Sequence, residues 1–420
     1  MKKLLGSFLV FFTLQTVLAQ TLSPTIVKHK SIYYERLAQV DTVLKQYVNK
    51  SWLVGAVVIV VKDNQVAYYK GFGYSDLATK KPMKADAIFR IMSQTKAITS
   101  LGIMQLFEQG KLNLDQHISD FLPEFKNPNL IKTFNAKDSS YTTTPAKREI
   151  TFRDLLTHTS GIDYPAIGTD TMQAIYAKNN IPSGLGYFNE NLLSKMKALG
   201  KLPILHNPGE RFTYGLNTDL LGCLIEIISG ESLETYCHKH IFEPLGMKDT
   251  YFNVPATKAA RLATVYTEDK DQKIIEWSPR FRNIDPEYPL IPKSYFSGGA
   301  GLSSTALDYS IFLQMLLNGG RYNNKQILGR RTVELMLSPQ LADNLFGDDN
   351  FSLGFGLTSK RSANLKMLNA GSFAWGGYYG TTYWADPKEK MICLIMTQHT
   401  PNSHWDYADK ITNIIYGSLK

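Results

Sequence analysis

The stretch FRIMSQTKAITSLGIMQLFEQGKL, residues 89–112, brings a serine and a lysine together where a loop becomes an amphipathic helix. Ser93 and Lys96 are three residues apart, so on a helix both side chains project from one face. If the lysine is neutral, desolvated by apolar neighbours, it can take the serine proton during nucleophilic attack. The helix N-terminus adds a dipole that favours the alkoxide. This spacing predicts a nucleophilic serine.

The Ser-x-x-Lys spacing alone is weak, because it arises by chance in a chain of this length. A second match, Ser194-Lys195-Met196-Lys197, lies on a stretch without a strong apolar face, and we expect it on the solvated surface. For Ser93 the alternative is an N-cap serine beside an exposed lysine. The sequence has no Gly-x-Ser-x-Gly elbow, no His-Glu-x-x-His motif and no phosphate-binding P-loop. The context of Ser93 must therefore decide its role.

Strands are expected near both ends of the chain. The apolar run 55–61 and the segment 65–70 flank Asp63-Asn64, which predicts a hairpin, and the segments 381–385 and 391–397 repeat the pattern. Helices are expected between them, at 93–109, 220–228 and 306–317. The polar stretch 127–148 is expected to be exposed.

These elements predict an α/β fold of α+β type. One antiparallel sheet comes from both termini and is flanked by helices, and a mainly helical lobe is inserted between its halves. We expect the sheet lobe to span about 28–92 and 295–420, and the helical lobe about 93–294.

The context of Ser93 resembles the serine β-lactamase superfamily, in its branch of class C β-lactamases, DD-peptidases and family VIII carboxylesterases. The resemblance covers about Tyr47 to Thr397 and rests on the order and spacing of several motifs. Besides FRIMSQTK these are GFGYSD, ITFRDLLTHTSGI, NPGERFTYGLNTDLLGCLIE, SGGAGLSSTALDYSIFLQMLLNGG and WGGYYGTTYWADPKEKMICLIMTQ. It implies a β-lactamase/DD-peptidase-like fold and an acyl-enzyme mechanism.

The resemblance also assigns roles to matching positions. It implies that Ser93 is the acyl-accepting nucleophile, Lys96 its partner base, and Tyr214 the shuttle that carries a proton to the leaving group. Trp375, Gly376 and Gly377 occupy the place of the family's Lys-Thr-Gly or His-x-Gly strand. The backbone N–H groups of Ser93 and Tyr378 would then form the oxyanion hole.

Two positions depart from the family pattern. Leu216 replaces the asparagine of the Tyr-x-Asn motif, and Asn217, a candidate for substrate contact, comes one place late. Trp375 stands where penicillin-recognising enzymes usually keep a cation for the substrate carboxylate. Losing an amide and a cation weakens the lactamase interpretation, and a tryptophan wall favours neutral, apolar acyl groups.

Other residues of the matching motifs are expected to be structural. His158 and Ser160 are interpreted as a hydrogen-bonded loop scaffold, and Asp219 as a cap for the helix after Tyr214. Cys237 lies near two histidines, but residues two apart on a helix face different directions, so we expect no zinc site.

The first 19 residues are expected to be a signal peptide. Lys2 and Lys3 precede the apolar run 4–17 and the small-residue cleavage site 17–19. This predicts export to a periplasm or to the outside, and no later run is long enough to span a membrane. Removing the two lysines lowers the formal charge from +9 to +7. Without a dense basic block, we expect no nucleic-acid partner.

The function that we expect is an exported serine hydrolase, a carboxylesterase acting on small or apolar esters. One alternative is a β-lactamase or DD-peptidase acting on β-lactams or cell-wall peptides. Another is a non-catalytic, penicillin-binding-like sensor of wall fragments. None of these functions requires a metal or an organic cofactor, and the expected partners are an ester or lactam substrate and cell-wall fragments.

Overall fold

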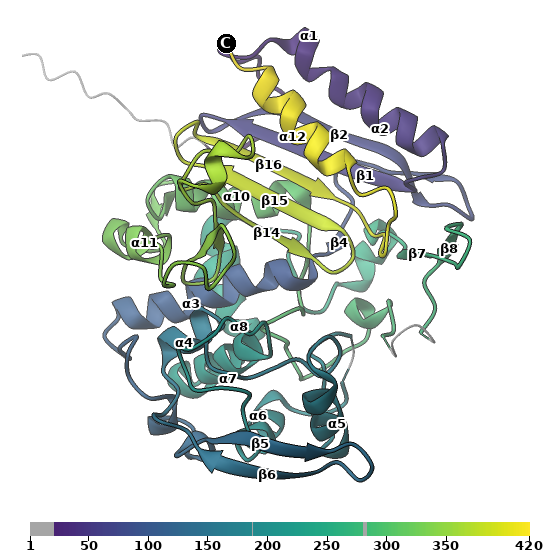
Figure 1. Cartoon of the computed structure of the whole chain (residues 1–420). Coiled ribbons are helices and arrows are strands. Elements are labelled where there is room, and N and C mark those ends of the chain that lie inside the picture. The colour runs from purple at the N-terminus through teal and green to yellow at the C-terminus, as the bar shows by residue number, and fades with distance from the viewer. Residues whose placement is uncertain (1–20, 187, 280–283) are drawn as a thin grey trace, which may run out of the picture.

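The computed structural model describes residues 21–186, 188–279 and 284–420 (Figure 1). The predicted signal peptide lies outside the described residues. Figure 1 shows a sheet made of purple and yellow-green strands in the upper half of the molecule, with the middle of the chain forming a helical region below it. The predicted fold, an antiparallel sheet from both termini with an inserted helical lobe, is confirmed. The exact lobe boundaries stay predictions.

Eight antiparallel strands form the sheet, in the order β12-β13-β14-β15-β16-β1-β2-β3. The two halves join where β1 pairs with β16, with Ile59 opposite Leu394. Both predicted hairpins are confirmed, as β1–β2 and β15–β16. The strands are β1 Gly55–Lys62, β2 Gln65–Asp76, β3 Lys81–Pro82, β12 Asn350–Phe351, β13 Gly356–Leu357, β14 Phe373–Gly377, β15 Thr381–Asp386 and β16 Met391–Met396.

Strand β1 is buried along its whole length because it has a core on each side. Val57 and Ile59 face the larger core, shared with the helical lobe, whereas Val58 and Val60 face a smaller one. Successive residues of a strand point to opposite faces. A strand buried on both faces needs an unbroken apolar run, which the sequence of β1 supplies.

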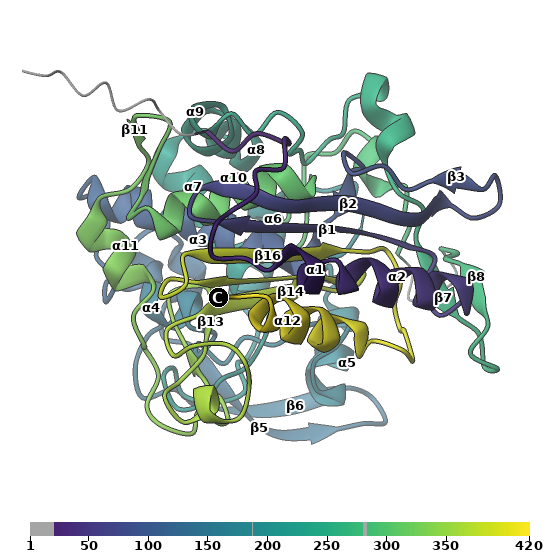
Figure 2. The same ribbon diagram turned by 90° about the horizontal axis from the view of Figure 1, so that it is seen from above.

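Three helices cover the smaller core, as the view from above shows (Figure 2): α1 Tyr34–Leu37, α2 Gln39–Asn49 and α12 Tyr407–Gly417. Helices α3 Thr95–Glu108 and α10 Ala306–Leu317 both contribute to the larger core. Helix α10 has the predicted bounds, and the helix predicted at 93–109 is α3, preceded by a 3-10 turn at Met92–Gln94. Almost every residue of α3 is buried, so this helix is internal.

The remaining helices lie mainly in the lobe: α4 Phe152–Leu156, α5 Asp170–Lys178, α6 Leu192–Gly200, α7 Asn217–Ser229, α8 Leu233–Cys237 and α9 Glu243–Leu245, with α11 Arg330–Met336 beside the sheet. Helix α7 contains the predicted segment 220–228 and is followed by Gly230, which has a φ of 76°. Left-handed backbone of this kind favours glycine after a helix.

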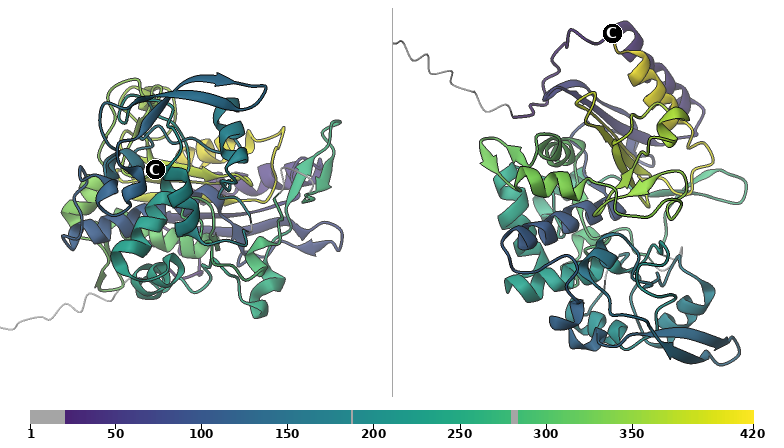
Figure 3. Two further views of the ribbon diagram at one scale, coloured as in Figure 1. Left: turned by 90° about the horizontal axis from the view of Figure 1, so that it is seen from below. Right: turned by 60° about the vertical axis from the view of Figure 1, so that its left-hand side comes forward.

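The polar stretch 127–148 is exposed, as predicted, but it is not irregular. It forms a hairpin of β5 Asn129–Asn135 and β6 Ser140–Pro145 at the far end of the lobe (Figure 3). Three further short strand pairs connect loops: β4 Phe89–Arg90 with β9 Ser303–Ser304, β7 Tyr266–Glu268 with β8 Ile274–Glu276, and β10 Arg321–Tyr322 with β11 Lys325–Gln326.

Cys223, Cys237 and Cys393 are buried and unbridged. Within the described ranges, no cluster of His, Cys, Asp and Glu side chains is arranged to hold a metal ion. In the same part of the chain, no helix is both long and apolar enough to cross a bilayer.

Leu101 in α3 tests how far the sheet and the lobe depend on this internal helix. Its side chain is fully buried, so Leu101→Ala should lower the free energy of unfolding by about 2–5 kcal/mol, measured by urea denaturation. Leu365, which is 73% exposed, provides the matched control, and Leu365→Ala should change stability by less than about 0.5 kcal/mol. Similar losses in both variants would contradict the assignment of α3 to the core.

Candidate active site

Ser93 lies at the junction between strand β4 and helix α3. The chain turns here through Met92–Gln94, and Met92 has a φ of 47°. A positive φ is unfavourable for methionine, so packing must hold it. The Met92 side chain is fully buried, and the Tyr288 hydroxyl lies 3.8 Å from its sulfur. The turn leaves Ser93 partly exposed at the start of the helix, as expected.

Lys96 is the second residue of α3 and is almost completely buried. Its Nζ donates hydrogen bonds to Ser93 Oγ at 3.3 Å, to the Tyr164 hydroxyl at 3.2 Å and to the Gly299 carbonyl at 2.8 Å. An ammonium group has three N–H donors and no acceptor. Three acceptors therefore satisfy a charged Lys96, and the predicted serine–lysine pair is in contact.

The surroundings of Lys96 are polar, not apolar as the hypothesis of a neutral lysine requires. Burial lowers the pKa of the Lys96 ammonium, but the phenols of Tyr164 and Tyr214 raise it. The buried carboxyl of Asp219 acts in the same direction, and the net pKa is raised. The structure therefore favours a positively charged Lys96 in the resting site, held beside Ser93.

Tyr164 was missed by the sequence analysis. It lies in the loop after Ser160, and burial raises the pKa of its phenol, which keeps the hydroxyl neutral. The Lys96 Nζ lies 5.4 Å from the centre of its ring. The available signal was its place two residues after the motif that contains His158 and Ser160, a segment that we interpreted as scaffold.

Tyr214 flanks Lys96 as well, with its ring centroid 4.6 Å from Nζ. Its hydroxyl accepts a hydrogen bond from Trp375 Nε1 at 3.3 Å. The Trp375 ring packs against Phe351 and Phe346, at centroid distances of 5.3 and 6.2 Å. These contacts fix the indole, so it forms a firm wall beside Tyr214.

A pocket of about 370 Å³ opens onto Ser93. This is within the size range of small-molecule sites. The described residues that line it are Ser93, Tyr164, Ile167, Leu185, Tyr214, Trp375, Gly376 and Tyr378. No Asp, Glu, Lys, Arg or His is among these lining residues. The buried Lys96 therefore supplies the positive charge next to the nucleophile.

Strand β14 brings the predicted glycines to the nucleophile turn. A Cβ atom at Gly377 would lie 2.4 Å from the carbonyl oxygen of Ile91, so the two backbones touch here. Gly376 lines the pocket and Gly377 does not. Tyr378 shares the pocket with Ser93, as expected, and the oxyanion hole formed by their two N–H groups stays a prediction.

Asn217, the candidate for substrate contact, does not line the pocket. It begins α7 and is fully buried, where its amide nitrogen and His158 Nδ1 are 2.9 Å apart and its carbonyl oxygen accepts a hydrogen bond from Ser160. Because Asn217 follows Tyr214 by three positions instead of two, its side chain turns into the lobe. The expected scaffold role of His158 and Ser160 is confirmed, and Asn217 belongs to that scaffold.

Asp219 does not cap α7, contrary to expectation. It lies in the first turn, after the N-cap Leu216, and is fully buried. Tyr295 donates a hydrogen bond to it at 3.3 Å. A Cβ at Gly299 would lie 2.5 Å from Asp219 Oδ2, so only glycine fits between this carboxyl and Lys96. Burial raises the pKa of Asp219 to about 6.

The second Ser-x-x-Lys match forms no serine–lysine pair. Ser194 is exposed and donates to the Asn191 carbonyl at 2.9 Å, while Lys197 lies 3.4 Å from a Glu124 oxygen. The prediction of a solvated surface is wrong for Lys195, which is buried and lies 2.6 Å from a Glu190 oxygen. The stretch is structural.

Residues 40–414 match the sequence profile of the family described as Beta-lactamase. The chain belongs to the beta-lactamase family. It is 30% identical over 378 residues to Protein Rv1367c of Mycobacterium tuberculosis, covering 87% of this chain and 90% of that protein. It is 27% identical to Esterase EstB of Burkholderia gladioli, and this match covers 86% of this chain and 90% of EstB.

The solved structure of EstCE1, described as a hydrolase with promiscuous acyltransferase activity, has a TM-score of 0.79 to this chain at 27% identity. The match covers 91% of this chain and 99% of EstCE1. Together these findings confirm the resemblance inferred from the motifs. The protein is a serine hydrolase of the beta-lactamase family.

Gly377 tests the contact between β14 and the nucleophile turn. Gly377→Ala should push the strand away from Ile91 and lower kcat by about tenfold or more, because small misplacements of reacting groups are costly. Gly417→Ala in α12 is the control, since a Cβ there would meet no atom within 4 Å and the residue does not line the catalytic pocket. Both variants are assayed for ester turnover, with circular dichroism to check the fold. Equal losses of kcat would contradict the proposed contact.

Asp219 makes the stability of the protein depend on pH. Its pKa is raised from 3.8 to about 6 in the folded state, so its stabilising contribution is complete below about pH 4 and is lost as the pH rises through 6. Asp219→Asn cannot ionise. From pH 4 to pH 8 its free energy of unfolding should therefore gain about 2–3 kcal/mol relative to the unsubstituted protein. Urea denaturation at both pH values measures this difference, and a constant difference would show that Asp219 is not the titrating group.

Proposed function

We propose that the protein is a carboxylesterase that cleaves small or apolar esters through an acyl-enzyme. The observation that carries the proposal is the pocket on Ser93, whose walls are aromatic and aliphatic. Trp375 stands where penicillin-recognising relatives usually keep a cation, which favours neutral substrates. The similarity to EstB and EstCE1 supports an ester as the acyl donor.

In the proposed first step, Ser93 Oγ attacks the ester carbonyl carbon. The Tyr214 hydroxyl relays the proton: its oxygen accepts the serine proton while it donates its own proton to the leaving alkoxide, as the ester C–O bond breaks. The Lys96 ammonium, 3.3 Å from Ser93 Oγ, stabilises the negative charge that develops during attack. Tyr164 and Gly299 hold this ammonium in place.

The second step releases the acid. Water attacks the acyl carbon of the Ser93 ester, and the Tyr214 hydroxyl accepts a proton from the water while it donates its own proton to Ser93 Oγ, as the acyl bond breaks. The products are the carboxylic acid and the free serine. These steps require neither a metal nor an organic cofactor.

A β-lactamase or DD-peptidase would use the same Ser93, Lys96 and Tyr214. Its substrates carry a carboxylate, for which the described lining residues offer no cation. A binding protein for wall fragments would have no need for the hydrogen bond between Lys96 and Ser93. We therefore propose the esterase first and let substrate choice test it.

We also propose that the protein is exported to a periplasm or to the outside, on the basis of the charge and hydropathy pattern of residues 1–19. The mature chain should then begin at Gln20. Expression of the full-length gene in a Gram-negative host, followed by intact-mass measurement of the periplasmic fraction, checks the cleavage site. A full-length chain in the cytoplasm would contradict export.

Substrate choice separates the esterase from its rivals. We expect kcat/KM for p-nitrophenyl butyrate to exceed that for a chromogenic cephalosporin by at least about tenfold, because a pocket without a cation cannot pair with the carboxylate of the lactam. A higher value for the cephalosporin would reverse the assignment. Ser93→Ala should abolish both ester turnover and labelling by a fluorophosphonate, whereas unlabelled native protein would favour the binding function.

A further inference from the structure

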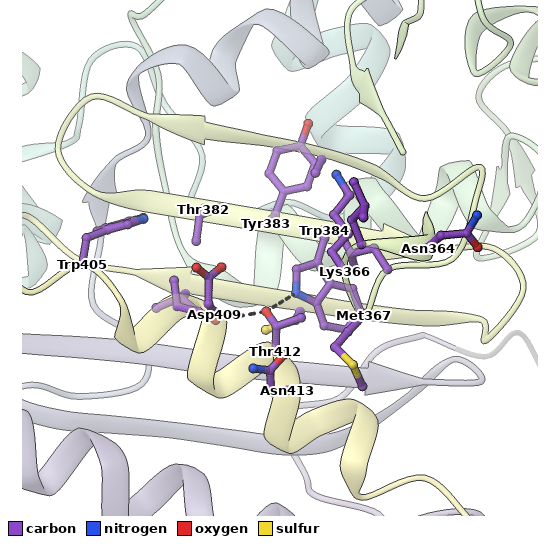
Figure 4. Close-up of a pocket in the computed structure, with 16 residues that line it drawn as sticks. Asn364, Lys366, Met367, Thr382, Tyr383, Trp384, Trp405, Asp409, Thr412 and Asn413 are labelled. Carbon is purple, nitrogen blue, oxygen red and sulfur yellow. Dashed lines mark hydrogen bonds between the residues drawn. The ribbon is translucent and has the colours of Figure 1, made fainter. Parts of the chain in front are cut away.

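A second cavity, larger than the catalytic pocket, lies on the outer face of the sheet. It has a volume of about 750 Å³ and is bounded by α12, strands β14–β16 and the loop 364–368 (Figure 4). We call it the outer groove. Ala374 lines the outer groove and its neighbour Trp375 lines the catalytic pocket. Because neighbouring strand residues face opposite sides of a sheet, the sheet separates the groove from Ser93.

The groove exists because the helix and the sheet place small side chains opposite each other. Ala408 and Thr412 on α12 face Ala374 and Cys393 on the strands, and all four line the space. Trp384 lies among them, and its indole nitrogen donates to Thr412 Oγ1 at 3.1 Å. Its N–H is thus already used, so the indole offers its apolar ring to an occupant.

Large apolar side chains are exposed at the rim of the groove. Leu365 is 73%, Met367 45% and Trp405 38% exposed, and all three line the same space. Single exposed hydrophobic residues are common on protein surfaces, but three around one cavity mark a binding surface.

The charged side chains that line the groove differ in their ion pairs. Its lining contains one basic side chain, Lys366, and one carboxylate, Asp409. The Lys366 ammonium lies 2.6 Å from Asp349 and is thereby neutralised. Across residues 21–186, 188–279 and 284–420, no side chain forms an ion pair with Asp409. Figure 4 shows its carboxylate projecting from α12 into the groove, between Trp405 and Trp384.

We propose that the outer groove binds a free, single-chain amphiphile with a cationic head, such as an alkylammonium. The head lies against the Asp409 carboxylate and the Trp405 indole, since an ammonium is attracted both to an anion and to an aromatic face. The apolar tail extends past Trp384 toward Leu365 and Met367. A groove of this volume accommodates such a molecule.

The test uses the full mature chain, with Ser93 blocked by a fluorophosphonate so that the catalytic pocket is occupied. Isothermal titration calorimetry with decyltrimethylammonium as the probe should show one binding site per chain. Asp409→Asn should weaken binding about tenfold, equivalent to roughly 1.4 kcal/mol. Decyl sulfate, which has the same tail and the opposite charge, should bind at least about tenfold more weakly.

Asp406→Asn is the matched control. Asp406 lies one turn from Asp409 but is hydrogen-bonded to Tyr47 and paired with Lys410, outside the groove lining. The Asp406→Asn substitution should therefore leave the affinity for decyltrimethylammonium unchanged. Equal affinity of the native and Asp409→Asn proteins, or stronger binding of decyl sulfate, would overturn the proposal. Sedimentation with phosphatidylcholine vesicles that is lost in Asp409→Asn would also overturn it, because the occupant would then be a membrane surface.

Discussion

The buried ammonium of Lys96 is the constraint around which the site is arranged. A charge that is removed from water must find hydrogen-bond partners in the protein. Those partners come from separate parts of the chain: Ser93 from the turn that precedes α3, Tyr164 from the lobe and the Gly299 carbonyl from the return to the sheet. The Asp219 carboxyl lies next to Gly299 and offsets the positive charge of Lys96. Position 299 must be glycine, because a Cβ there would collide with this carboxyl. The nucleophile is held in place by the same contacts that keep the cation stable.

The parts of the site that the sequence predicted are those defined by local spacing. Ser93 and Lys96 meet because they are one helical turn apart, and the resemblance placed Tyr214 and Trp375 on the same pocket. Tyr164 and Gly299 contact Lys96 only through tertiary packing, which no spacing in the sequence reveals. The asparagine at 217 was misjudged for a local reason, since a shift of one residue at the start of a helix turns the side chain to another direction.

The same distinction applies to the fold. Helix α10 has the bounds that the sequence predicted. Thr305 caps its start, accepting a hydrogen bond from the Asp308 N–H at 3.2 Å, and glycines follow its end. Strand β1 was recognisable from an apolar run that fills two cores. The hairpin β5–β6 was not predicted, because its exposed strands lack the apolar alternation of a half-buried sheet. The strands β12 and β13 are two residues each, too short for any periodic signal.

The pairing of β1 with β16 also determines when the protein can fold. The two central strands come from opposite ends of the chain, with Val57 opposite Met396. Contacts between distant segments require a large loop to close first, and folds dominated by them form slowly. During synthesis the hairpin β1–β2 emerges early, but its neighbouring strand β16 and the helix α12, which covers its smaller-core face, are the last to leave the ribosome. Folding of the sheet therefore follows completion of the chain, and until then the exposed apolar strand β1 favours aggregation with other unfolded chains.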